Sequence, residues 1–275
     1  MHISCECEWQ KLRSSVIAVA QMNCALGHIE DNLDQIEQIT KEISKKKQAN
    51  VVCFPELATT GYSLGPKWIK LADEIPGKTT DRLASIASEN GCYIICGIDE
   101  KDKKKIYDSA VLIDPSGKIV GTYRKVHLWD KEKEFFTPGK EFPVFQTEIG
   151  RVGIGICYDV EFPEPARIMA KRGAQVVFFP SAEMRPMENH VETYVKSRSA
   201  ENCMYVAFSN RIGREGKTLF FGRSQIASPA CRVLAKAGYN DKFVSARIDT
   251  SFLETEKALL PYLRDLAPQA YRVTT

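Results

Sequence analysis

One stretch, residues 151–165 with the sequence RVGIGICYDVEFPEP, constrains the fold of this chain more than any other. Within it apolar residues alternate with Gly153 and Gly155, which predicts a buried strand with close backbone neighbours. Cys157 ends this strand, and a proline-rich turn leads to a segment of helical periodicity at 166–172. A nucleophile on a sharp strand-to-helix turn projects outward beside backbone N–H groups. A buried free cysteine is often only a core residue, but this context favours a reactive Cys157.

Length, charge and hydropathy exclude several classes of protein. The 275 residues are 44% hydrophobic and 27% charged, which suits one large domain or two small ones. A net charge of only +3 gives no electrostatic case for a nucleic-acid partner. No apolar run approaches the ~20 residues of a membrane span. The N-terminus has no apolar core of a signal peptide, so secretion is not expected.

The nine cysteines indicate a reducing compartment rather than a fold held together by disulfides. Their count is odd and their spacing irregular, which predicts free thiols and a reducing cytoplasm. Cys5 and Cys7 form a lone C-x-C pair with no second pair nearby, so they do not indicate a zinc site. Cys92 and Cys96 lie on one face of an expected strand, where packing explains both.

The remainder of the chain alternates between expected strands and helices. We expect residues 1–14 to form an N-terminal extension and residues 15–275 a single domain. Apolar spacing and closing glycines predict helices over 32–46, 80–90, 164–172 and 188–202. Apolar runs and turn signals predict strands over 16–22, 50–54, 92–97, 107–113, 118–125, 151–156, 175–179, 204–209, 224–228, 232–235 and 243–248. Residues 130–140 have the composition of a polar loop.

An internal repeat organises these elements. Residues 49–56, ANVVCFPE, and residues 174–181, AQVVFFPS, each follow an amphipathic helix and contain a strand that ends at a proline. The repeat predicts two similar halves packed sheet against sheet, with helices outside and a cleft that collects residues at strand ends. The helix–strand alternation would also fit a doubly wound parallel sheet. The strands within 107–125 are joined by a tight turn, which favours antiparallel or mixed pairing instead.

Activation of Cys157 requires a base or a positive neighbour, because a free thiol has a pKa of about 8.5. The candidates are His127, His190, Lys125 and Glu56. A papain-like pair would use one of the histidines, but its oxygen-bearing third partner is not evident. Glu56 and Lys125 each follow an apolar strand, where a buried charge is costly unless it is paired or functional. In a Glu–Lys–Cys set the carboxylate would take the thiol proton, and the ammonium and a backbone N–H would stabilise the oxyanion.

Three motifs resemble the nitrilase superfamily of carbon–nitrogen hydrolases, in particular its amidase-like branch. They are FPEL at 54–57, YRKVHL at 123–128 and GICYDVEFPE at 155–164, in the family's order and spacing. The resemblance covers residues 16–271 and implies an α/β fold, a four-layer α-β-β-α sandwich with two mixed sheets, which agrees with the repeat. It also implies no metal or organic cofactor, and assembly into a homodimer or a higher homo-oligomer.

The resemblance implies a role for each motif residue. Glu56 would be the general base, Lys125 and the Tyr158 backbone N–H would bind the oxyanion, and Cys157 would be the acylated nucleophile. The implied reaction expels ammonia or an amine to give a thioester on Cys157, which water then hydrolyses to the acid.

Further residues match the family less directly. A second family glutamate, which positions the substrate and the lysine, matches Glu132 best, with Glu134 as the alternative. His127 is expected to brace Lys125 rather than to carry protons. Arg198 lies in a helix motif whose implied role is structural, a buried arginine that bonds main chain near the nucleophile turn.

The expected substrate is a small linear amide. Tyr158 and Asp159 after the cysteine resemble amidases, whereas true nitrilases tend to have Trp-Glu there. Hydrolysis of N-carbamoyl amines or amino acids and of nitriles remain alternatives, as does a partner-binding protein that lost turnover. Arg185 would either bind a substrate carboxylate, as in omega-amidases or carbamoyl-amino-acid hydrolases, or lie at the surface. The candidate pocket residues are Tyr62, Trp129, Glu183, Met184, Arg185 and residues 208–210.

Overall fold

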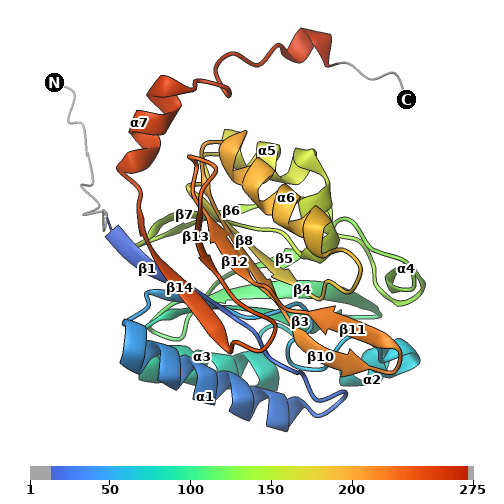
Figure 1. The fold of residues 1–275 in the computed structure, drawn as a ribbon. Helices are drawn as coiled ribbons and strands as arrows, with labels where there is room; N and C mark the ends of the chain where they lie inside the picture. The colour runs from blue at the N-terminus through green and yellow to red at the C-terminus, as the bar shows by residue number, and fades with distance from the viewer. Residues whose placement is uncertain (1–13, 272–275) are drawn as a thin grey trace, which may run out of the picture.

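The computed structural model describes residues 14–271, which form four layers (Figure 1). Two six-stranded sheets pack face to face in the middle. Helices α1 (Ile29–Lys47) and α3 (Lys78–Asn90) cover the outer face of one sheet, and α5 (Pro163–Lys171) and α6 (Glu188–Ala200) cover the other. The α-β-β-α sandwich with two mixed sheets, expected from the sequence, is therefore confirmed.

The two sheets share one pairing pattern. The first has the order β14-β1-β2-β3-β4-β5 and the second the order β13-β12-β9-β8-β7-β6. In each, three neighbouring strands are parallel (β1, β2 and β3; β7, β8 and β9), and the other pairings are antiparallel. The internal repeat is therefore confirmed. The first sheet contains β1 (Ser14–Ala20), β2 (Val51–Cys53), β3 (Tyr93–Asp102), β4 (Lys105–Ile113), β5 (Ile119–Arg124) and β14 (Phe243–Asp249); the second contains β6 (Val144–Thr147), β7 (Gly150–Ile154), β8 (Val176–Ser181), β9 (Tyr205–Asn210), β12 (Gln225–Ala227) and β13 (Val233–Lys236).

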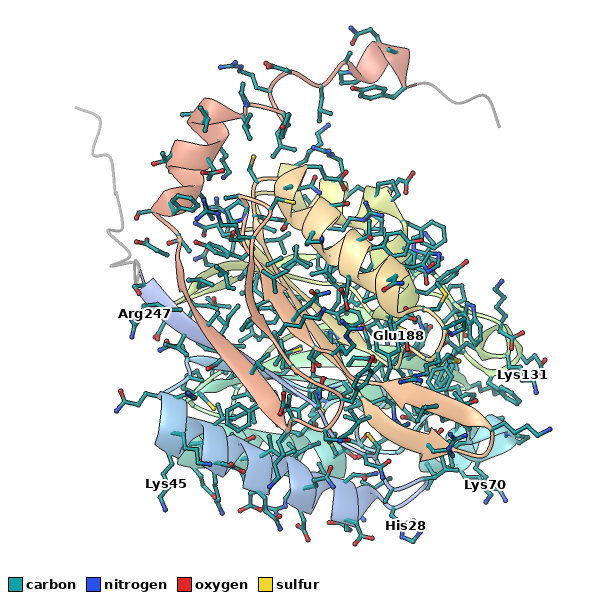
Figure 2. All side chains as sticks on the ribbon, viewed as in Figure 1. His28, Lys45, Lys70, Lys131, Glu188 and Arg247 are labelled. Carbon is teal, nitrogen blue, oxygen red and sulfur yellow. The ribbon has the colours of Figure 1, made fainter. Side chains whose placement is uncertain are left out.

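Apolar side chains fill both the space between the sheets and the space under the helices. The equivalent strands β2 and β8 are buried along their whole length, as central parallel strands covered on both faces must be. Between the sheets the Ser209 hydroxyl lies 2.8 Å from the carbonyl of Ala20 and 2.9 Å from that of Cys53, which ties the layers together. Polar side chains such as His28, Lys45 and Lys70 point outward from the rim (Figure 2).

The sequence missed several short elements. The hairpin of β10 (Ile212–Glu215) and β11 (Thr218–Phe221) and the edge strand β6 were not expected. The loop expected at 130–140 contains a helical turn, α4 (Glu132–Phe135), and α2 (Trp68–Leu71) is a further one. Short elements of this kind depend on tertiary contacts more than on their own periodicity.

The two ends of the described chain differ in their relation to the sandwich. Strand β1 begins at Ser14, so the boundary expected after residue 14 falls inside this strand. The rest of the expected extension, with Cys5 and Cys7, lies outside the described residues. At the other end α7 (Phe252–Leu259) and the following segment reach away from the body (Figure 1). Among residues 14–271 no helix combines the length and the apolar character needed to cross a membrane.

Candidate active site

The three motif residues lie just beyond the ends of three different strands. Glu56 is the third residue after β2, Lys125 directly follows β5, and Cys157 is the third residue after β7. All three are buried: Glu56 and Lys125 are fully enclosed, and Cys157 is 7% exposed. Strands of both sheets therefore bury an acid, an ammonium and a thiol, and the charges of Glu56 and Lys125 both act on the Cys157 thiol.

The Lys125 ammonium lies among three carboxyl groups. Its Nζ is 2.5 Å from Glu56 Oε1, 2.8 Å from Glu132 Oε1 and 3.5 Å from Asp108 Oδ2. Burial alone would lower the pKa of Lys125, but the carboxylates of Glu132, Glu56 and Asp108 outweigh it and raise this pKa well above its ordinary value. Lys125 is therefore a permanent cation, held on three sides.

Glu132, rather than Glu134, is the second glutamate at this cluster. It is 1% exposed, whereas Glu134 lies at the surface. The hydroxyl of Tyr62 donates to Glu132 Oε1 at 2.5 Å, and the backbone N–H of Trp129 donates to Oε2 at 2.9 Å. These bonds hold Glu132 on Lys125 and connect the cluster to two expected pocket residues.

Asp108, which the sequence analysis did not select, completes the carboxyl cluster. It lies inside β4 and is fully buried, and burial together with the nearby Glu56 carboxylate raises its pKa well above the ordinary value. Among the described residues, neither Asp108 carboxyl oxygen nor Glu56 Oε2 accepts a hydrogen bond from a backbone N–H or from Lys125, and the Asp108 and Glu56 carboxyl groups interact with each other instead. The sequence could have indicated Asp108, because it lies inside the apolar run IYDSAVLI and a buried carboxyl group is costly without a partner.

The carboxyl cluster has the spacing of a metal site but already holds a cation. One oxygen from each of Glu56, Asp108 and Glu132 lies within 4.8 Å of the others. Lys125 Nζ is within 3.5 Å of all three groups, in the position that an ion would take. The residues present therefore suit an ammonium rather than a metal ion at this place.

Cys157 sits at the start of a tight turn that is fixed from several sides. It begins the 3₁₀ helix η2 (Cys157–Glu161) with a left-handed φ of 45°, a conformation that non-glycine residues rarely adopt. A Cβ on Gly155 would lie 2.5 Å from the ring of Phe179, so glycine is required there. The Asp159 carboxylate accepts the Ile156 N–H at 2.8 Å across the turn. Such strain persists only where the surroundings determine the backbone, and it is frequent at active sites.

His127 braces Asp159 and not Lys125, so that expectation is wrong. Its Nδ1 and its backbone N–H lie 2.7 Å and 3.1 Å from Asp159 Oδ1, and its ring stacks on Phe162 at 4.0 Å. The chain turns after Lys125, and this turn directs the two side chains to different partners. His190 is exposed on α6. Neither histidine is hydrogen-bonded to the Cys157 thiol within residues 14–271, which removes the main support for a papain-like pair.

Arg198 supports the nucleophile turn from outside, as expected. It is 6% exposed, its Nε donates to the Val160 carbonyl at 3.0 Å, and its Nη2 donates to the Glu161 carbonyl at 2.8 Å. Its structural role at the main chain after Cys157 is confirmed.

Cys157 forms part of the wall of a cavity of about 220 Å³, here called the Cys157 cavity. Its Sγ lies 3.6 Å from Glu183 Oε1. Burial is the largest cause that raises the pKa of the Cys157 thiol well above its ordinary value, and the Glu183 and Glu56 carboxyl groups add to it. Burial also raises the pKa of Glu183, to about 8. The thiol therefore needs a base at the moment of reaction. The cavity is lined by Tyr62, Trp129, Cys157, Tyr158, Glu161, Ala182, Glu183, Met184 and Met187.

Of the expected pocket residues, Tyr62, Trp129, Glu183 and Met184 line this cavity, and Arg185 does not. The Arg185 side chain is 51% exposed, pairs with Glu188 at 3.0 Å and lies over the ring of Tyr239. Asn210, the last residue of the 208–210 candidate, lies behind the wall, where its Oδ1 accepts the Glu183 N–H at 2.7 Å. Of the two alternatives for Arg185, the structure places it at the surface.

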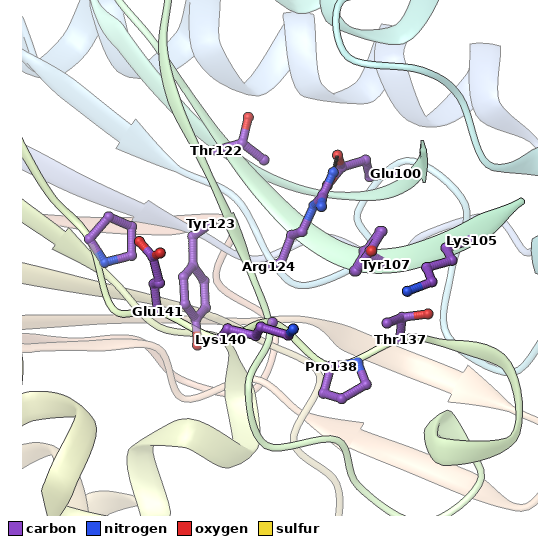
Figure 3. A pocket seen from close by; sticks show the side chains of 12 residues that line it. Glu100, Lys105, Tyr107, Thr122, Tyr123, Arg124, Thr137, Pro138, Lys140 and Glu141 are labelled. Carbon is purple, nitrogen blue, oxygen red and sulfur yellow. Dashed lines mark hydrogen bonds and ion pairs between the residues drawn. The ribbon is translucent and has the colours of Figure 1, made fainter. Parts of the chain in front are cut away.

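Two further hollows lie near the cluster. One of about 380 Å³ shares Tyr62, Trp129 and Met184 with the Cys157 cavity and also reaches Glu132, so it forms a second approach to the cluster. The other, of about 550 Å³, lies beside Tyr123 and Arg124 of β5 and the loop at 137–141 (Figure 3). There Arg124 points at Glu100 and pairs with it. None of the residues that line this third hollow is a cysteine or a histidine.

Comparison with known proteins identifies related sequences over nearly the whole chain. The family model described as "Carbon-nitrogen hydrolase" matches residues 16–257. A protein from Pyrococcus abyssi named nitrilase is 37% identical over 88% of this chain and 92% of its own. A protein from Xenopus tropicalis named omega-amidase NIT2 is 35% identical over 88% of this chain and 92% of its own.

A solved structure shares the fold and carries a covalent adduct. It is a glutamate-to-glutamine mutant of the amidase from Nesterenkonia sp. AN1, described as showing covalent addition of the acetamide moiety of fluoroacetamide at the active-site cysteine. It is 27% identical, covers 94% of this chain and 95% of its own, and aligns with a TM-score of 0.84.

Proposed function

This chain belongs to the carbon–nitrogen hydrolase family, and we propose that it hydrolyses a small linear amide through a thioester on Cys157. Its amidase and nitrilase relatives make it a hydrolase of carbon–nitrogen bonds. One observation carries the proposed mechanism. Lys125 bridges Glu56 and Glu132 at 2.5 Å and 2.8 Å, and Tyr62 connects Glu132 to the Cys157 cavity.

In the first half-reaction Cys157 attacks the amide carbon. Glu56 takes the thiol proton, because Lys125 occupies its Oε1 and not its Oε2, and because the thiol pKa is too high for a free thiolate at neutral pH. The new carbon–sulfur bond leaves an oxyanion on the former carbonyl oxygen. The Lys125 ammonium and the Tyr158 backbone N–H stabilise this charge. The carbon–nitrogen bond then breaks, Glu56 returns its proton to the nitrogen, and ammonia leaves.

The second half-reaction restores the enzyme. Glu56 takes a proton from water, whose oxygen attacks the thioester carbon, and the same donors hold the second oxyanion. Breakage of the carbon–sulfur bond releases the carboxylic acid, and the sulfur recovers its proton from Glu56. Glu132 keeps Lys125 in place throughout, supported by its bonds from Tyr62 and Trp129. The sum is amide plus water to acid plus ammonia.

The competing assignments within the family differ in the substrate rather than in the nucleophile. A carbamoyl amine or amino acid would give a carbamoyl thioester, and a nitrile would give a thioimidate that needs a second water. We favour the amide because Tyr158 and Asp159 follow the cysteine and because omega-amidase and amidase relatives cover most of the chain. The family suggests a homodimer or a higher homo-oligomer, which remains a prediction, as does the single domain over 15–275.

Ammonia release from a panel of short amides tests this function. Wild-type protein should release ammonia, Cys157→Ala and Lys125→Ala should not, and His127→Ala should retain turnover if it folds. An inactive His127 variant beside an active Lys125 variant would support a papain-like pair. No ammonia from a broad panel, with no adduct on Cys157, would support the partner-binding alternative.

A further inference from the structure

The described side chains that line the Cys157 cavity include two acids and no base. Glu161 and Glu183 both line it, whereas no lysine or arginine among residues 14–271 does. Glu183 is 6% exposed, and its Oε1 has only the Cys157 thiol as a partner. The Glu161 carboxylate is half-buried, and no described side chain forms a hydrogen bond or an ion pair with it. A half-buried carboxylate without a partner costs free energy that a bound cation would recover.

The remaining lining is suited to a small organic cation. Tyr62, Trp129 and Tyr158 present aromatic rings, and Met184 and Met187 present thioethers. Aromatic faces attract ammonium groups through the ring quadrupole. The volume of about 220 Å³ lies below the usual range for drug-sized ligands, so the ligand must be short.

We propose that this cavity selects a short amide whose far end carries an ammonium group, and that Glu161 supplies the counter-charge. The inference rests on the proposed function, because Cys157 fixes the reacting end of the substrate. Glu183, beside the sulfur, has a pKa raised to about 8 by burial, so it is mostly protonated at neutral pH and the negative charge at the cavity rests on Glu161. Arg185, the one arginine that the sequence offered as a partner for such a carboxylate, lies outside the cavity and pairs with Glu188.

The basic side chains nearest to the cavity do not reverse this selection. Arg198 donates to the Glu161 backbone carbonyl, but it does not line the cavity and its Nη1 pairs with Glu201 at 3.0 Å. Lys125 is fully buried and already surrounded by three carboxyl groups. Lys131 belongs to the adjoining hollow, where Asp130 accompanies it, and its side chain points outward from the surface near α4 (Figure 2). Burial raises the pKa of Glu161, and His190 opposes this with a smaller effect. His190 is exposed and does not line the cavity.

Three amides of similar size with different far ends test the proposal: 4-aminobutanamide, pentanamide and succinamate, which are positive, neutral and negative. The wild type should show kcat/KM in the order positive, neutral, negative, with at least about 100-fold between the extremes, as expected for charge selection in a partly desolvated site. Glu161→Gln should reduce that ratio by about 10-fold or more and leave pentanamide within about 3-fold. Glu161→Lys should favour succinamate.

Glu164→Gln is the matched control, because Glu164 is an exposed acid only three residues away and does not line the cavity. It should leave the ratio unchanged. Preference of the wild type for succinamate, or an unchanged ratio in Glu161→Gln, would overturn the inference while the amidase function stands. Release of ammonia from none of the three amides would instead count against the proposed function itself.

Discussion

A single methyl group at Gly97 should disable the site without altering any proposed catalytic side chain. Gly97 lies in β3, its N–H donates to the Pro55 carbonyl at 3.1 Å, and its carbonyl accepts the Ala58 N–H at 2.9 Å. A Cβ there would lie 2.5 Å from Pro55 O, 2.6 Å from Glu56 Cα and 2.7 Å from Leu57 N. All three contacts are with backbone, so no side-chain rotation can relieve them.

The size of the effect follows from these distances. Ordinary contacts of a Cβ begin at 3.4 Å, so the turn that carries Glu56 must retreat by about 0.8 Å. A displacement of about 1 Å in a catalytic group costs about 100-fold in rate, and overpacking of a core costs about 1–3 kcal/mol. We therefore expect Gly97→Ala to lower kcat/KM about 100-fold while the protein remains folded.

Ammonia release and urea-induced unfolding would measure the two effects on the same preparation. Gly238→Ala is the control, because its Cβ would meet first the carboxylate of Asp241, the end of a flexible surface side chain, at 3.2 Å. It should match the wild type in both measurements. Wild-type kcat/KM in Gly97→Ala would refute the argument that the position of Glu56 limits the reaction.

Three other substitutions test the electrostatics of the site. Lys125→Met removes the cation from three buried carboxyl groups, so it should lower the free energy of unfolding by about 3–5 kcal/mol in urea titration; no loss would contradict the described ion pairs. Burial raises the pKa of Glu183 from 4.5 to about 8, so the folded state binds a proton that the unfolded state lacks in this window, and stability falls as the pH rises through it. Glu183→Gln should therefore gain in Tm over the wild type from pH 5 to pH 9, and a constant difference would argue against the shift. Asp159→Ala leaves the Tyr123 hydroxyl and the Ile156 N–H without their acceptor, so it should lower kcat about 10-fold or more and also lower the free energy of unfolding. Unchanged kcat and stability would show that the turn after Cys157 keeps its conformation without Asp159.

The sequence predicted the layers well because the apolar pattern repeats. Val51–Cys53 and Val176–Ser181 are fully buried central strands, and such strands carry continuous apolar runs that stand out from their surroundings. The hairpin β10–β11 was missed although Gly216 marks its turn, because glycines and charges interrupt its alternation. Edge and hairpin strands bury a smaller fraction of their side chains, so their sequences show a weaker apolar pattern from which a strand could be predicted.

The candidate site was predictable where a charge follows an apolar strand. Glu56 and Lys125 were found in this way, and the two prove to be direct partners. Asp108 was missed because it lies within a strand rather than after one. The placements of His127 and Arg185 depend on how the chain turns after β5 and β8, and side-chain direction in a turn follows from tertiary packing that spacing does not encode.

The identity of the acylated atom is the most direct test of the account. Wild-type protein mixed with a short amide, quenched in acid within the first turnover and digested, should yield a peptide containing Cys157 whose mass is increased by the acyl group. Treatment with hydroxylamine should remove that mass, as expected for a thioester. Ammonia released with the acyl group on another residue, or with no covalent adduct at any time, would contradict the mechanism.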